Sequence, residues 1–247
     1  MRRLRRWAIA SAVLLLAGTS VAVVFTRALV RSAPPWWRSV DAQDPRVADL
    51  AVRLENAVVT HLTSARPTAS GLAADEPWRS EDWSVAIGAP EVNAWLNARL
   101  PSWLASNTDF DQWPDELDDV QVEFRDGLVR VGVLVRAGAA QQVLSADLRP
   151  SVRPDGSVWL PAEWIHIGRL PVPASWVLGD AEEDGREYIP EPLLASGDAG
   201  DMFEVFEGLA AAGTEPIVSL GDGRQVRLLD VEPRDGRLVL TLRTERR

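Results

Sequence analysis

A charge-free run of nineteen residues, Trp7 to Phe25, stands directly after Arg2, Arg3, Arg5 and Arg6. At 1.5 Å rise per helical residue, this run is about 28 Å long, which is close to the hydrocarbon thickness of a bilayer. We therefore expect a single transmembrane helix. The excess of arginine before the run predicts that the amino terminus lies in the cytoplasm and that the remainder lies outside, although Arg27 and Arg31 on the far flank weaken this orientation.

A cleaved signal peptide is the alternative to an anchor. Its apolar core would be about 7 to 15 residues long and would end in an A-x-A-like site. Only Ser20-Val21-Ala22 comes near that pattern, so we favour an uncleaved anchor in the inner membrane. The expected organisation is a cytoplasmic arginine cluster and anchor over residues 1–31, a juxtamembrane stalk over 32–43, and an extracytoplasmic domain over 44–247.

Charge divides at the same place. Residues 1–38 hold seven Arg and no acidic residue, whereas residues 39–247 hold 19 Arg against 36 acidic residues, a formal charge of −17. Such a domain repels nucleic acid, and it is held away from anionic lipid except through the juxtamembrane arginines. The chain has no Cys, which excludes disulfides, thiolate catalysis and Cys-ligated metals.

The stalk begins with a stiff, aromatic segment. Pro34 and Pro35 precede the paired Trp36 and Trp37. Prolines favour an extended backbone, and indoles suit the membrane interface. Docking of both indoles on the domain is an equally good interpretation.

The periodicity of the remaining residues predicts one mixed domain. Asp44 and Pro45 are typical of a helix start, and apolar residues follow at helical spacing up to Arg66. A short strand over Trp83–Ile87 and a helix opening at Pro90 come next. From Val120 the period becomes two. Two hairpins are expected, one from Val120 to Val135 that turns at Asp126-Gly127 and one from Arg224 to Leu242 that turns at Asp235-Gly236. Between them, single strands are expected over Gln142 to Leu148 and Val158 to Ile167.

The two hairpins share letters: VEFRDGLVRV begins at Val122 and VEPRDGRLVL at Val231. We favour convergence on the same turn chemistry over duplication, because nothing between them repeats. Antiparallel pairing through tight turns predicts an α+β fold, a curved antiparallel sheet packed with the long amphipathic helix.

Three segments carry a resemblance to a known family: WSVAIGAPEVNAWL from Trp83, DLRPSVRPDGSVWL from Asp147 and IHIGRLPVPASWVL from Ile165. With the hairpin between them, they resemble the YpmS-like family of membrane-anchored extracytoplasmic proteins. That family is similar to tubular lipid-binding domains, so the resemblance implies a long helix in a strongly curved sheet with an apolar groove. It implies no catalytic residues. The acidic tail from Asp180 departs from the family pattern.

Motifs of catalysis are missing from the sequence. The two histidines, His61 and His166, lie 105 residues apart, and no nucleophile elbow, zinc-protease motif or phosphate-binding loop occurs. Packing accounts for both histidines. We therefore expect a protein that is not an enzyme and needs no cofactor.

One acidic loop has the spacing of a calcium site. Oxygen ligands at positions 1, 3, 5 and 12 of an EF-hand-like loop would be Asp180, Glu182, Asp184 and Glu191, with Gly185 at position 6. Glu at position 3 and the prolines around position 12 oppose it. A plain solvated loop is the favoured interpretation, so we assign no metal.

Taken together, these patterns favour a protein that binds a lipid or another apolar envelope ligand in a groove. An envelope scaffold that uses an apolar surface for protein contact is the alternative, and an enzyme working through acidic loops is a weaker third. The chain has eleven Trp, and the indole combines a large apolar face with one donor. The groove candidates are Trp95, Trp159, Trp164, Ile165, Ile167 and Trp176.

Overall fold

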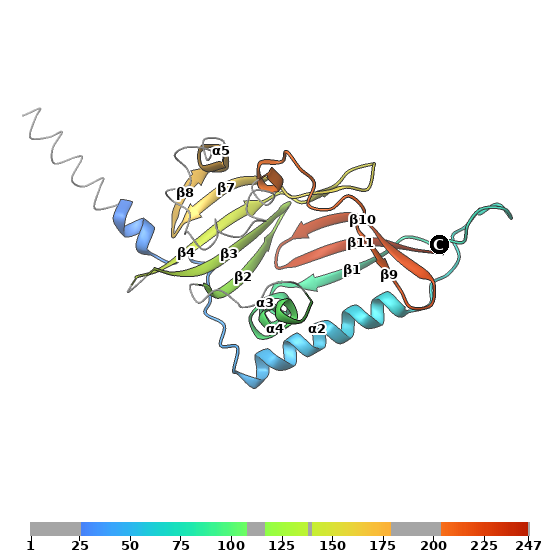
Figure 1. The fold of residues 1–247 in the computed structure, drawn as a ribbon, viewed down its shortest axis with the longest axis horizontal. Helices are drawn as coiled ribbons and strands as arrows, with labels where there is room; N and C mark the ends of the chain where they lie inside the picture. Colours follow the sequence, from blue (N-terminus) through green and yellow to red (C-terminus); the bar gives the residue numbers. More distant parts are fainter. Residues whose placement is uncertain (1–25, 108–116, 138–139, 179–203, 247) are drawn as a thin grey trace, which may run out of the picture.

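The protein folds as α+β, with two main antiparallel sheets beside a group of helices (Figure 1). The computed structural model describes residues 26–107, 117–137, 140–178 and 204–246. The helices are α2 (Pro45–Thr63), α3 (Ala89–Ala98), α4 (Leu100–Asn107) and α5 (Ala174–Leu178). Residues 26–31 are also helical.

Both sheets are antiparallel, and each contains hairpins of consecutive strands together with one pairing of strands that are not consecutive. The five-stranded sheet has the order β2 (Leu117–Arg125), β3 (Leu128–Ala137), β4 (Ala140–Leu148), β7 (Ala162–Ile167) and β8 (Leu170–Pro173). The four-stranded sheet has the order β1 (Trp83–Gly88), β11 (Arg237–Arg246), β10 (Arg224–Arg234) and β9 (Ile217–Ser219). A small pair is formed by β5 (Ser151–Val152) and β6 (Val158–Trp159).

Helix α2 has well-formed ends. The side chain of Asp44 accepts a hydrogen bond from the backbone N–H of Arg46 at 2.9 Å, and Pro45 opens the first turn. At the other end, the guanidinium of Arg224 donates to the carbonyls of Thr63 and Ser64. Both contacts satisfy backbone groups that a helix end leaves without partners.

Two of the most completely buried side chains lie where β10 and β11 pair. Val226 is paired with Thr244, and both are almost fully buried. The N–H of Ser80 donates to the carbonyl of Thr244 at 2.8 Å, and the N–H of Thr244 donates to the hydroxyl of Ser80 at 3.0 Å. The hydroxyl of Thr244 accepts from the indole N–H of Trp83 at 3.2 Å. This core fixes the segment before β1 on the four-stranded sheet.

Three details of the predicted fold are corrected. The curved antiparallel part consists of two sheets rather than one. The long helix α2 packs chiefly on α3, where the indole of Trp95 donates to Glu55 at 3.2 Å. The strand expected over Val158–Ile167 is divided into β6 and β7, because Pro161 has no N–H for a continuous ladder.

Within the described ranges, no helix is both long and apolar enough to cross a membrane. The predicted span Trp7–Phe25 lies outside the residues that the structure describes.

Candidate ligand-binding cleft

A cleft of about 950 Å³ opens where the segment before α2 (residues 32–43), the starts of α2 and α3, strand β2 and the β10–β11 turn meet. Its volume falls in the upper part of the range of ligand pockets, roughly 300 to 1,000 Å³. Apolar side chains from several elements line it: Trp36, Val40, Val47, Leu50, Ala94, Val122 and Phe124.

The segment 32–43 forms one wall of this cleft because it lies against the five-stranded sheet. Trp36 and Trp37 pack edge to face, with ring centroids 5.5 Å apart, over the bare backbone of Gly132. The side chain of Gln121, only 2% exposed, accepts from the N–H of Arg38 at 3.1 Å and donates to its carbonyl. The indoles therefore contact the domain.

Helix α3 closes the edge of β2 with two asparagines. Asn93 accepts from the N–H of Val122 at 2.6 Å and donates to its carbonyl at 2.9 Å. One turn later, Asn97 bonds the N–H and carbonyl of Val120 in the same way, at 3.2 and 2.8 Å. Four helical residues rise about 6 Å and two strand residues span about 6.8 Å, so residues i and i+4 of the helix match alternate residues of the strand. These amides replace a neighbouring strand.

Charged side chains surround the apolar floor of the cleft. Glu123 pairs with Arg125 at 2.9 Å, and Asp44 is held by its capping bond to α2. Acidic residues outnumber the arginines among the charged side chains that line the cleft, which are Arg38, Asp41, Asp44, Glu123, Arg125 and Asp235. An apolar floor with a charged rim suits an amphipathic molecule.

A buried polar cluster lies beside Trp36 on the same face of the five-stranded sheet. Both carboxylate oxygens of Asp147 accept from Arg130, one of them at 2.7 Å. His166 Nε2 is 3.9 Å from Asp147, and burial lowers the pKa of His166, with Arg130 adding to the effect and Asp147 opposing it. Ser145 lies opposite His166. Among the described residues, Ser145 Oγ and His166 Nδ1 have no hydrogen-bond partner.

The cluster has the residue types of a hydrolytic triad without its geometry. Arg130 occupies both oxygens of Asp147, and 3.9 Å is too long for a hydrogen bond that would orient His166. We interpret it as structural.

The predicted groove residues do not lie together, and none lines the cleft. Ile165 and Ile167 are half-buried on the apolar face of β7, opposite Ala146 and Leu144. Trp164 lies on the other face, opposite Asp147. Trp159 donates to Ser157 Oγ at 2.7 Å.

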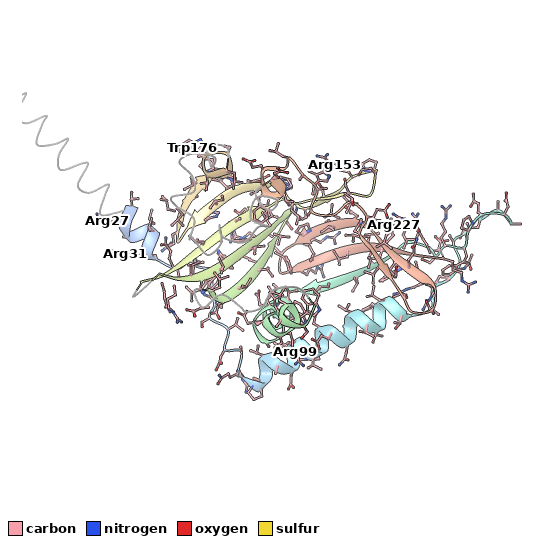
Figure 2. All side chains as sticks on the ribbon, in the orientation of Figure 1. Arg27, Arg31, Arg99, Arg153, Trp176 and Arg227 are labelled. Atoms are coloured by element: carbon pink, nitrogen blue, oxygen red, sulfur yellow. The ribbon has the colours of Figure 1, made fainter. Side chains whose placement is uncertain are left out.

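Two further tryptophans of that set lie on helices at opposite edges of the five-stranded sheet. Trp95 lies on α3, beside β2, and Trp176 lies on α5, beside β7 and β8 (Figure 2). Trp95 is bonded to Glu55, whereas Trp176 is 71% exposed. The two indoles therefore belong to different surfaces.

No group of three or more His, Asp or Glu side chains in the described part of the chain is placed to hold a metal ion. The calcium candidates Asp180, Glu182, Asp184 and Glu191 lie outside the described residues.

Sequence reasoning missed the residues that build the cleft walls. Asn93 and Asn97 carried a weak signal, because asparagine is a poor helix former and two of them at i and i+4 indicate side chains with a specific partner. No feature of the sequence distinguishes Gln121 or Gly132 from an ordinary strand residue.

Comparison with protein-family models, with curated proteins and with solved structures finds no match to this chain. The interpretation of its function therefore follows from its own residues and their geometry.

Proposed function

We propose that this protein is a membrane-anchored extracytoplasmic protein that binds a lipid or similar amphipathic ligand without transforming it. The observation that carries the proposal is the cleft beside β2, about 950 Å³ in volume, with an apolar floor and a charged rim. A buried apolar chain gains roughly 25 cal/mol per Å², while a polar head remains at the rim.

A row of apolar residues crosses the five-stranded sheet from the edge of the cleft. Val122, which lines the cleft, begins a cross-strand row whose members lie on one face because side chains alternate along a strand. The row runs through Val131, Ala146, Ile165 and Val172. All four are half-buried. This row offers a path for an acyl chain longer than the cleft itself.

Anchoring remains a prediction from the sequence. The charge-free run Trp7–Phe25 after four arginines supports it. The anchor would place the cleft near the outer surface of the inner membrane, since the juxtamembrane segment that follows the anchor also forms a cleft wall.

The test is mass spectrometry of lipids that remain with the full chain after mild detergent extraction. Val47→Asp puts a charge on the cleft wall, and it leaves α2 intact because an acidic residue is favourable in the first turn of a helix. We expect lipid recovery to fall at least tenfold. Val59→Asp on the same helix is the matched control, because Val59 is 59% exposed and does not line the cleft.

Ile165→Glu distinguishes a short ligand from a long one. If an acyl chain follows the cross-strand row, this variant also loses lipid while it still unfolds cooperatively. Lipid recovery that is equal in wild type, Val47→Asp and Val59→Asp would reject the cleft as the binding site.

The scaffold alternative is favoured by a separate observation. Val52 and Val59 are exposed on α2 and lie two turns apart, so they share one face of the helix. Two results together would favour a scaffold over a lipid-binding protein. The extracted protein would carry no lipid, and a complex cross-linked in cells would be disrupted by Val59→Asp but not by Val47→Asp.

A further inference from the structure

A large aromatic side chain projects from the short helix α5. Trp176 is 71% exposed, and its indole has no hydrogen-bond partner among the described residues. Trp164, also exposed, lies opposite Pro173, the residue directly before α5. Exposed indoles are costly in water, whereas they suit an interface that is apolar on one side and polar on the other.

Three arginines lie near the β7–β8 turn, at the other end of the short strand β8 from α5. Arg27 and Arg31 belong to the helical residues 26–31, and Arg169 occupies the β7–β8 turn. The N–H of Arg169 donates to the carbonyl of Leu29 at 2.9 Å, so the helical residues and the turn are held together. Within the described ranges, none of the three guanidinium groups forms a hydrogen bond or an ion pair.

The backbones of the helical residues and of the β7–β8 turn approach each other closely at this junction. A Cβ atom on Gly168 would lie 2.1 Å from the carbonyl oxygen of Val30, so only glycine fits there. Gly168 also has φ +61°, in the left-handed region that glycine prefers. The direction in which residues 26–31 leave the sheet is therefore set by the fold.

Figure 2 shows Arg27, Arg31 and Trp176 toward the same side of the molecule, the upper left in this view. Arg27 and Arg31 lie where the helical residues leave the sheet, and Trp176 projects from α5 on the same side in this view, whereas α2 lies on the opposite side. The chain that enters at residue 26 comes from the predicted membrane span Trp7–Phe25. A membrane crossed by that span would face this side of the domain.

We propose that Arg27, Arg31, Arg169, Trp164 and Trp176 form a membrane-contact patch that binds the headgroup region of an anionic phospholipid bilayer. The proposal rests on the anchoring part of the proposed function. Guanidinium groups bind lipid phosphates, often in bidentate fashion, and the indoles insert at the level of the headgroups. The acidic remainder of the domain, with formal charge −17 over residues 39–247, is repelled by the same surface. The patch therefore fixes one orientation of the domain on the membrane.

The absence of cysteine from the chain permits a clean test. Trp176→Cys and, as a matched control, Val218→Cys are each made in the full chain, labelled with an environment-sensitive fluorophore and reconstituted into vesicles. Val218 is 49% exposed on β9, the edge strand of the other sheet. Lipids with a nitroxide on the headgroup then quench any probe that lies at the bilayer surface.

We expect at least threefold stronger quenching at position 176 than at position 218 in vesicles of phosphatidylcholine and phosphatidylglycerol. Arg169→Gln in the Trp176→Cys background should reduce that quenching, whereas Arg99→Gln, on the helical side of the domain (Figure 2), should not. Equal quenching at both positions, or none at 176, overturns the patch.

A carbonate wash of the same vesicles separates this proposal from the anchor. If the chain stays in the membrane and residue 176 is not quenched, the patch fails while anchoring stands. If the chain is released by the wash, anchoring itself fails.

Discussion

Gly127 and Gly236 hold equivalent places in two similar hairpins, and each donates its backbone N–H to the other hairpin. Gly127 donates to the carbonyl of Pro233 at 2.9 Å, and Gly236 donates to the carbonyl of Phe124 at 3.0 Å. Both glycines have φ near +75°, which tight turns of this kind require. The β2–β3 turn thus docks on the β10–β11 turn by reciprocal hydrogen bonds.

This junction joins the two sheets and sets the position of the cleft. Ala89, the first residue of α3, donates to the carbonyl of Gly236 at 3.0 Å, so the same turn also fixes the helix that covers β2. The neighbours of the two hairpins differ, since β3 pairs with the following strand β4 and β11 pairs with the early strand β1. That difference supports convergence on one turn chemistry rather than duplication.

The asparagines of α3 should contribute measurably to stability. Asn93→Ala leaves the N–H and carbonyl of Val122 without partners at a half-buried edge, so we expect a loss of about 2 kcal/mol in the free energy of unfolding. Asn93→Asp retains the shape but cannot donate to the carbonyl, and it should also destabilise. Urea titration measures both.

Asn56→Ala is the control for these variants, because Asn56 is exposed on α2. If Asn93→Ala and Asn56→Ala have the same midpoint, the amide contacts to β2 carry no net stability.

Gly132 should be essential for docking of the segment 32–43 on the five-stranded sheet. A Cβ atom there would lie 2.7 Å from Cη2 of Trp36 and 3.0 Å from Cζ3 of Trp37. Overpacking of this kind costs about 1 to 3 kcal/mol. We therefore expect Gly132→Ala to release the indoles, seen as a red shift of tryptophan fluorescence. Gly221→Ala, where a Cβ meets nothing within 4 Å, should leave the spectrum unchanged.

The sequence predicted the elements whose signals are local. The Asp44-Pro45 start of α2, and the turns at Asp126-Gly127 and Asp235-Gly236, were found at the expected places. Each depends on residues within a few positions of one another, so periodicity and turn chemistry suffice.

The cleft was not predictable, because its walls come from residues far apart in the chain. Arg38 meets Gln121, and Asn93 meets Val122, through contacts that no local pattern encodes. The predicted groove residues are divided between surfaces for a local reason: Ile165 and Trp164 are adjacent in sequence, so alternation along the strand sends their side chains to opposite faces of β7. Pairing of strands decides which tryptophans share a surface.

Stability should fall in mild acid because of His166. Burial lowers its pKa from the ordinary value of 6.5, with Arg130 and Arg125 adding to the effect and Asp147 opposing it. The unfolded state then binds more protons than the native state just below pH 6.5, so the free energy of unfolding decreases as pH falls through that region toward the lowered pKa. His166→Gln should flatten this dependence, measured by urea titration across pH. The exposed His61 is the control, and an equal flattening in His61→Gln would assign the effect elsewhere.

The acidic loop from Asp180 should not respond to calcium. A ligand that does not bind the native state cannot raise the melting temperature, so millimolar Ca²⁺ should leave the thermal transition unchanged. A rise that Glu191→Gln abolishes would show that the loop is a calcium site after all.

The amino-terminal run should remain in the mature protein as an anchor. Its nineteen charge-free residues exceed the apolar core of a signal peptide, and four arginines precede them. We expect the chain to resist extraction of membranes with carbonate and to retain its first residues in amino-terminal sequencing. Replacing Val13 and Leu14 by Arg should release the chain, because each charge at the centre of a span costs about 2.5 to 3.5 kcal/mol on the insertion scale. A soluble wild-type form that begins near Val23 would instead identify the run as a cleaved signal, and it would also remove the attachment on which the membrane-contact patch depends.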